Sequence, residues 1–479
     1  MEKTVDPLLT TIVDYVYQDR IFTEDTLKAA YLCLMDAIGC YTQALFVPAC
    51  RTYLGPIVPE TEVPNGVRIP GIDTLLDPVK AAWDLGAGIR WLDYNDTWLV
   101  KEWGHPSDNL GGILAVADFV SQEAKRRAKP GLTLKQVLET MTKAYEIQGI
   151  LAIDNAFNEV GIDHVILVKI ATIAAISPWL GLTHHQAISA LSHAWVDGQS
   201  LRTYRHAPNT NSRKSWAAGD ATSRAVFLAM LAKKGLESCP QAMTTPRWGF
   251  EAVLFKGKSV TLHQPLSDFV IRHILFKVAF PAEFHAQTAI ECAFELHPLV
   301  GNQWEKVDRI EIETQKPAID IISKKGPLHN PADRDHCLQY MVAVGLLQGE
   351  LSHHAYTEDF SKTPGIDALR EKMIVKENPE FYKRYLDIQD RAIPNQVQVF
   401  FKDGTQSPVV RRDYPLGHPK RRVEALPFLQ KKYEKGVKLH YQDDALETVL
   451  ARFSYSNEPI LFLDWWGDFV YREEIGIFG

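Results

Sequence analysis

A polar stretch that begins at Asp93 contains the side chains best suited to acid–base chemistry. Asp93, Asp96 and Thr97 fall at positions i, i+3 and i+4, so they share one face if the helix predicted before them continues that far. His105 follows in a loop, and Gly111-Gly112 in the next predicted helix would let a ligand approach the backbone. Histidine titrates near neutral pH, and a carboxylate beside it can orient the ring or share its proton. Proton transfer and simple helix capping explain these residues about equally well.

Residues 197–214 concentrate basic groups on a chain that is acidic as a whole. This segment has a single acidic residue, Asp197, and its basic residues are Arg202, Arg205, His206, Arg213 and Lys214. Guanidinium groups bind carboxylates through paired hydrogen bonds, and lysine supplies a point charge. A solvated loop is the usual explanation of such a run, but nearby aromatic and small residues favour partial burial. We therefore expect this segment to bind a small polyanion.

Three shorter segments mix acids, bases and turn residues. They are residues 161–164 with Asp163 and His164, residues 280–285 with Glu283 and His285, and residues 324–336. Taken singly, each is more typical of a scaffold than of a catalytic site.

The spacing of apolar residues indicates which elements must position these groups. Helical periodicity runs through residues 9–16, 27–38, 81–92 and 137–145, and Asp77-Pro78 has the form of a helix start. Thr133 opens a helix, and Thr183 with Gln186 has the spacing of a capping box. The helical periodicity gives way to strand patterns after residue 277 and returns near residue 423.

Strand patterns are confined to the middle of the second half. A short, imperfect one covers residues 307–312, whereas Val397, Val399 and Phe401 alternate strictly and lead into Asp403-Gly404, a hairpin signal. We therefore predict a mainly α protein with two domains. Residues 1–270, completed by residues 430–479, form a large all-helical domain, and residues 271–429 form a smaller, inserted α+β lid domain.

Composition excludes several classes of protein. The chain of 479 residues has 52 Lys+Arg and 59 Asp+Glu, a formal charge of −7, which argues against a nucleic-acid partner. No two of the six cysteines have CxxC spacing, so neither a zinc ribbon nor an iron–sulfur cluster of the aconitase kind is expected. The apolar residues 166–182 include Lys169 and Pro178 and are too few to span a membrane. With no signal peptide at its start, the chain is expected to be cytoplasmic.

Together, the five polar segments resemble the MmgE/PrpD family. The matching stretches run in family order from about residue 80 to residue 345: WLDYNDTWLVKEWGHPSDNLGGILA, GIDHVILVK, DGQSLRTYRHAPNTNSRKSWAAGDATSRA, LFKVAFPAEFHAQTA and KKGPLHNPADRDHCLQYMVA. Five long motifs in order are far more specific than a single short pattern. The last ~40 residues, which include Trp465 and Trp466, carry no motif that supports a functional inference.

The resemblance implies a helical domain packed against a smaller α+β lid, and a small tricarboxylate as substrate. Family members include a dehydratase of 2-methylcitrate, which acts in propionate breakdown, and a decarboxylase of cis-aconitate. Both work without a metal, so we expect no cofactor; a homodimer is left open. Some members have a pocket histidine where this chain has Glu283, with His285 two residues later. That departure favours dehydration, with citrate and cis-aconitate as further substrates to consider.

Carried over position by position, the family pocket comprises Asp93, Thr97, His105, His164 and Lys214. Loss of water needs a base for a carbon-bound proton, an acid for the hydroxyl, and cations for the carboxylates. We expect His105 to be the base or the acid with Asp93 beside it, and His164 to be the complementary group. The expected substrate contacts are Thr97, Arg202, Arg205, His206, Lys214 and His285. The alternatives are an enzyme similar to cis-aconitate decarboxylase and a non-catalytic tricarboxylate-binding protein.

Overall fold

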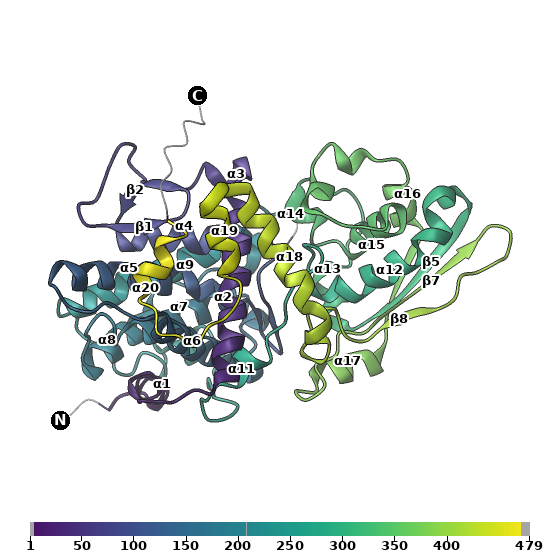
Figure 1. Ribbon diagram of the computed structural model, residues 1–479. Coiled ribbons are helices and arrows are strands. Elements are labelled where there is room, and N and C mark those ends of the chain that lie inside the picture. Colours follow the sequence, from purple (N-terminus) through teal and green to yellow (C-terminus); the bar gives the residue numbers. More distant parts are fainter. Residues whose placement is uncertain (1–3, 207, 471–479) are drawn as a thin grey trace.

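The computed structural model describes residues 4–206 and 208–470, and helices dominate it (Figure 1). Twenty α-helices and three small sheets lie within these ranges. The mainly α fold class predicted from the sequence is thereby confirmed. Residues 1–3 and 471–479 of the expected helical domain, and Ala207 of the basic segment, lie outside the described residues.

Two large hydrophobic cores organise the chain. The first is built from residues 9–278 and 425–469, and the second from residues 280–410. The first lies on the left of Figure 1 and the second on the right. The chain therefore leaves the first core near residue 279, builds the second, and returns.

The first core is an assembly of packed helices. Its longer helices are α1 (Pro7–Tyr17), α2 (Glu24–Ala44), α4 (Pro78–Arg90), α5 (Leu110–Arg126), α6 (Leu134–Asp154), α7 (Val165–Ile176), α8 (His184–Val196) and α9 (Arg213–Lys233). Short helices and hairpins complete it: α3 (Pro48–Arg51), α10 (Phe250–Val253), α11 (Phe269–Arg272), β1 (Val67–Ile69) with β2 (Ile72–Leu76), and β3 (Trp98–Leu99) with β4 (Trp103–Gly104).

The predicted helix starts are confirmed by their caps. Asp77 accepts hydrogen bonds from the backbone N–H groups of the first turn of α4, where Pro78 occupies the first helical position. Thr133 before α6 and Thr183 before α8 each form a complete capping box. The apolar helix α7 is buried, and no helix in the described part of the chain is long and apolar enough to cross a membrane.

Glycines let α4, α5 and α9 approach one another very closely. A Cβ on Gly86 of α4 would lie 2.9 Å from the Cα of Gly219 in α9, and one on Gly111 would lie 2.5 Å from the Ala82 carbonyl oxygen. Gly112 meets side chains of α7 and α9 in the same way. The prediction that Gly111-Gly112 admit a ligand is wrong: both are filled by helix packing.

The second core combines a four-stranded sheet with short helices. The sheet has the order β6-β5-β7-β8, with β5 (Val307–Thr314) parallel to β6 (Met373–Glu377) and antiparallel to β7 (Asn395–Phe401), which pairs with β8 (Val410–Arg412). The predicted hairpin is confirmed, because β7 and β8 are antiparallel neighbours around Gly404, which has a φ of 86°. The helices are α12 (Gln287–Val300), α13 (Lys316–Ile322), α14 (Pro331–Arg334), α15 (Leu338–Gln348), α16 (Ile366–Glu371) and α17 (Pro379–Leu386).

The C-terminal helices return to the first core. In Figure 1, α18 (Arg422–His440) runs along the boundary between the two parts, and α19 (Asp443–Ala451) and α20 (Phe462–Gly467) lie on the helical side. The buried Lys432 of α18 bonds to Asp36 of α2 at 2.5 Å. It also donates to the backbone carbonyls of Tyr94 and Lys277, at 2.5 and 2.8 Å. The Lys432 ammonium thus links the segments around Tyr94 and Lys277, which carry the first and fourth polar motifs.

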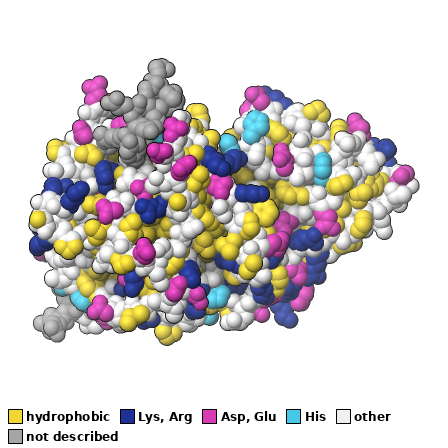
Figure 2. Space-filling model, viewed as in Figure 1, with side chains coloured by type: hydrophobic (Ala, Val, Ile, Leu, Met, Phe, Trp, Pro, Cys, Tyr) yellow, Lys and Arg dark blue, Asp and Glu magenta, His cyan; other side chains and the backbone are white. Residues whose placement is uncertain are grey.

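The surface has mixed charge on the face shown in Figure 2, where Lys and Arg side chains are interspersed with Asp and Glu.

All six cysteines are free thiols, and five of them are buried.

Candidate active site

A cavity lies where the two cores meet, and it gathers most of the residues singled out from the sequence. Its walls from the first core include Asp93, Thr97, His105, His164, Arg202, Arg205 and His206. Residues 283–336 close the other side with Glu283, Phe284, Ile321 and His336. Of the nine predicted site residues, only Lys214 and His285 do not line the cavity, and both contact side chains that do.

Asp93 reaches the cavity in a way that differs from the prediction. Helix α4 ends at Arg90, and Asp93 has a φ of 48°, in the left-handed region that a non-glycine residue rarely adopts. The helix therefore does not continue as far as Asp96 and Thr97, and the condition under which the three residues would share a helix face is not met. Asp96 lies behind the cavity, where its carboxylate accepts hydrogen bonds from Tyr145 and Ser107 at 2.6 and 2.7 Å.

The Asp93 carboxylate is surrounded by cations. It forms a buried ion pair with Arg90, and the Lys277 ammonium lies 3.0 Å from its Oδ1. Burial raises the pKa of Asp93, but Arg90, Lys277 and Lys214 outweigh that effect and hold it well below the ordinary value. Asp93 is therefore a permanent anion at neutral pH.

His105 is held in one tautomer. Its Nδ1 lies 2.7 Å from the carbonyl oxygen of Asp96, which can only accept, so Nδ1 carries the proton and Nε2 a lone pair. Nε2 is 3.9 Å from Oδ1 of Asp93, and the Thr97 hydroxyl is 3.4 Å from Nδ1. Burial lowers the pKa of His105 well below its usual value, and Arg90 and Lys277 lower it further. The ring is thus neutral and able to accept a proton.

His164 lies beside His105, with the ring centroids 5.8 Å apart and the rings edge to face. Its Nδ1 is 3.3 Å from Asp163, and its Nε2 is 3.7 Å from Asp108 without a hydrogen-bond partner. Burial lowers the pKa of His164, and Asp163 partly opposes that effect. Two buried carboxylates thus flank this imidazole.

The predicted substrate-binding cations differ in whether they already have a partner. Arg205 pairs with both carboxylate oxygens of Asp163, whose pKa is raised by burial but held well below its ordinary value by Arg205. Arg202 is buried and stacks on the Trp103 ring at 4.9 Å; its Nη1 lies 3.9 Å from carboxylate oxygens of both Glu102 and Asp163 and makes no hydrogen bond. His206 is an exposed residue at the cavity wall. Arg202 is therefore the guanidinium best placed to receive a new anion.

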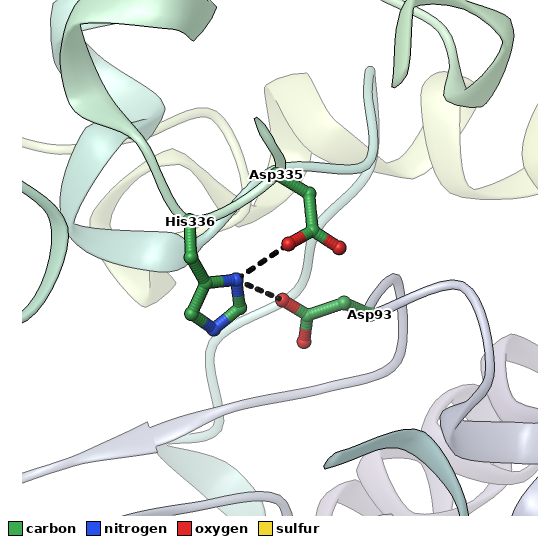
Figure 3. A group of neighbouring side chains, drawn as sticks. All are labelled: Asp93, Asp335 and His336. Atoms are coloured by element: carbon green, nitrogen blue, oxygen red, sulfur yellow. Dashed lines mark hydrogen bonds and ion pairs between the residues drawn. The ribbon is translucent and has the colours of Figure 1, made fainter. Parts of the chain in front are cut away.

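Lys214 takes part in an ionic cluster that joins the two cores. Its ammonium lies 2.6 Å from Oδ1 of Asp335 and 2.9 Å from Nδ1 of His336. Figure 3 shows the carboxylates of Asp335 and Asp93 on one side of the His336 ring, at 2.7 and 3.9 Å from its Nδ1. Burial lowers the pKa of both Lys214 and His336. The cluster places titratable groups from both cores in contact at the point where the cores meet.

The same cluster has the donor set of a metal site. Among the described residues, ligand atoms of Asp93, Asp335 and His336 lie within 4.8 Å of one another. However, the Lys214 ammonium already bonds to Asp335 and lies beside His336, and Arg90 and Lys277 contact Asp93. With three cations in contact, these groups fit anion binding and proton transfer better than a divalent metal.

His285 does not face the cavity, contrary to the position expected of a substrate contact. It is fully buried behind Glu283, and its Nδ1 and backbone N–H donate to the two oxygens of that carboxylate at 2.8 and 2.9 Å. Its Nε2 is 3.2 Å from the Tyr385 hydroxyl. Glu283 occupies the cavity wall, and His285 supports it from behind.

Sequence reasoning missed three ionisable cavity residues: Arg90, Lys277 and His336. Each left a signal. Arg90 ends an apolar helix directly before the first motif, Lys277 interrupts an apolar run, and His336 lies within the fifth motif. A charge in an otherwise apolar segment is costly unless it has a partner, which marks such residues as candidates for a buried site.

Comparison with known proteins agrees with this geometry. Residues 10–263 match the MmgE/PrpD N-terminal domain, and residues 280–453 match the MmgE/PrpD C-terminal domain. The chain belongs to the MmgE/PrpD family. The N-terminal match lies in the first core, whereas the C-terminal match covers the second core together with α18 and α19 of the first, and residues of both matched domains line the cavity.

Curated MmgE/PrpD relatives match nearly the whole chain. The 2-methylcitrate dehydratase of Escherichia coli is 50% identical over 462 residues, which cover 95% of this chain and 96% of the relative. The 2-methylcitrate dehydratase of Salmonella typhimurium is 52% identical with the same coverage. The mitochondrial 2-methylcitrate dehydratase of Yarrowia lipolytica is 49% identical, covering 96% of this chain and 88% of its own length.

Proposed function

We propose that this chain is a hydro-lyase that dehydrates 2-methylcitrate to 2-methyl-cis-aconitate, the step that its resemblance places in propionate breakdown. The observation that carries the proposal is the identity of 49 to 52%, over nearly the full length, to 2-methylcitrate dehydratases of two bacteria and a yeast. The cavity supports it, because imidazoles and cations suited to elimination from a polyanion meet there.

His105 is the base of the proposed reaction. Its Nδ1–H is committed to the Asp96 carbonyl, so the lone pair on Nε2 accepts the carbon-bound proton. The Asp93 carboxylate, 3.9 Å away, stabilises the imidazolium that forms. His164, beside His105, is the complementary group expected from the sequence.

Cations hold the substrate carboxylates and the charge that develops next to the broken C–H bond. Four line the cavity, Arg90, Arg202, Arg205 and Lys277, against two carboxylates, Asp93 and Glu283. Arg202 offers an Nη1 that makes no hydrogen bond, and Lys214 offers an ammonium that a substrate carboxylate can take over from Asp335. Thr97 and His206 complete the proposed contacts.

The two cores support the expected domains. We propose that residues 1–270 with 430–479 form the helical domain and that residues 271–429 form a lid that closes over substrate, because His336 and Glu283 reach the cavity from the second core. We further propose that the enzyme is cytoplasmic, that it holds no resident metal, and that it acts as a monomer or homodimer.

Product analysis tests the function. The purified protein is incubated with the stereoisomers of 2-methylcitrate, with citrate and with cis-aconitate, and both unsaturated acid and released carbon dioxide are measured. We expect unsaturated product from one 2-methylcitrate isomer and no carbon dioxide. Carbon dioxide from cis-aconitate would indicate a decarboxylase instead, and binding without turnover would indicate a non-catalytic binding protein.

A further inference from the structure

Glu283 is an anomaly in a cavity that has to hold a polyanion. Of the two carboxylates on the cavity wall, Asp93 is neutralised by Arg90 and Lys277. Within the described part of the chain, Glu283 has no lysine or arginine at ion-pair distance, although it is 9% exposed and borders the space that the substrate would fill. A carboxylate without a directly bonded lysine or arginine there repels an anionic ligand, so its presence calls for a chemical reason.

The Glu283 carboxylate is held in place from behind. Its Oε1 and Oε2 each accept one hydrogen bond from His285, and the backbone N–H of Glu283 donates to the Asp335 carbonyl at 3.3 Å. Each oxygen keeps a second lone pair. The group is therefore fixed in orientation and still able to bind a proton.

Glu283 is an anion while the cavity holds no substrate. The titratable and charged groups that face it are His285, His336, Lys277 and Tyr385. Burial raises the pKa of Glu283, but His285, His336 and Lys277 bring it below the ordinary value. A bound tricarboxylate engages the same cations and adds negative charge nearby, and both effects favour protonation of Glu283.

We propose that Glu283 takes up a proton when the tricarboxylate binds and delivers it to the departing hydroxyl. The inference rests on the proposed dehydration. His164 is the alternative donor, but its ring nitrogens lie 3.3 and 3.7 Å from the buried carboxylates of Asp163 and Asp108, so both nitrogens already face acceptors of the protein. A carboxylic acid at the cavity wall gives up its proton directly and returns to a stable carboxylate.

The step balances with the groups present. The C–H bond breaks, its proton goes to Nε2 of His105, and its electron pair becomes the second bond of the alkene. The C–O bond breaks, and the oxygen leaves with its electron pair and the proton of Glu283, as water. Glu283 ends as the carboxylate of the ligand-free enzyme, and His105 ends as imidazolium. His105 returns its proton to solvent after product release, which balances the proton that Glu283 takes up when the next substrate binds.

Glu283→Gln removes the group that binds the proton while conserving size, and its amide oxygen can keep one of the two hydrogen bonds from His285. We expect kcat with 2-methylcitrate to fall about 10²- to 10⁴-fold and KM to change only a few-fold. Glu305→Gln, at an exposed acid of the same core, is the matched control and should behave as wild type. A folded Glu283→Gln enzyme with kcat within about threefold of wild type would overturn the proposal.

Proton uptake gives a second readout that needs no turnover. Tricarballylate, which lacks the hydroxyl, is bound in buffers of different ionisation enthalpy, at a pH where the ligand is fully ionised. Wild type should take up about one proton more per site than Glu283→Gln. Equal uptake overturns the proposal. If wild type binds tricarballylate with this difference but fails to dehydrate 2-methylcitrate, the proposed substrate is wrong and proton uptake by Glu283 stands; no binding at all overturns both.

Discussion

Replacement of His105 by alanine separates proton transfer from structural support. The imidazole is 8% exposed and has one strong hydrogen bond, from Nδ1 to the Asp96 carbonyl, whose loss leaves that carbonyl without its donor. This should cost about 1–3 kcal/mol of unfolding free energy. Loss of the base should cost much more in the reaction: about 10²- to 10⁴-fold in kcat, or about 3–5 kcal/mol of activation free energy.

The assay follows the ultraviolet absorbance of the unsaturated product and, in parallel, thermal unfolding. Added imidazole should restore part of the activity of His105→Ala, because the deleted ring leaves space beside Asp93. His329→Ala, at an exposed histidine of residues 324–336, is the matched control and should retain wild-type kcat. If His105→Ala is folded and has wild-type kcat, or if its loss of activity only follows its loss of folded protein, the assignment of His105 as the base is refuted.

Four further outcomes are expected. Lys214→Ala should lower kcat/KM about 10- to 100-fold, more for tricarboxylates than for dicarboxylate analogues, and an unchanged kcat/KM would make the Asp335 pair purely structural. Activity should survive exhaustive chelation, and restoration by iron or another metal after a loss would refute metal independence. Because the pKa of Asp163 is depressed in the folded chain, its ion pair with Arg205 contributes stability above about pH 4 that is lost as pH falls further. Urea unfolding should therefore show a steeper loss below that pH for wild type than for Asp163→Asn, and parallel curves would contradict this. Trp466→Ala should lower the unfolding free energy by about 3–5 kcal/mol, because the indole is buried against the first core, and a near-native melting temperature would show that α20 is dispensable.

The elements were predictable where local physics decides them. The caps at Asp77, Thr133 and Thr183 act within one helical turn, so their residue types alone fix the helix starts. The β7–β8 hairpin was visible for the same reason, because alternation and an Asp-Gly turn are local features. The cavity residues of the first and third motifs were found by residue type and family likeness rather than by geometry.

The rest of the site depends on contacts between distant segments. No local pattern shows that Arg205 already binds Asp163 or that Lys214 binds Asp335, 121 positions away. Periodicity also does not show that α4 ends at Arg90 or that Asp93 has a left-handed backbone, so it could not decide whether Asp93, Asp96 and Thr97 share a helix face. His285 was predicted at the cavity wall, but Glu283 lies there and His285 lies behind it. The two residues are only two positions apart in a turn, and residue type alone does not show which of them faces the cavity.

The return of the chain to the first core has a consequence for how the protein is made. Tyr433, Trp465 and Trp466 belong to the same core as α1 and α2, although more than 400 residues separate Tyr15 from Tyr433 in sequence. On a ribosome, the first helices therefore emerge long before the residues that complete their packing. The inserted segment has its own core and can fold first. The apolar residues of the helical part that pack against the C-terminal helices stay exposed until those helices are made. Chaperone demand should thus peak before the last ~50 residues are synthesised, and C-terminal truncations should aggregate during synthesis.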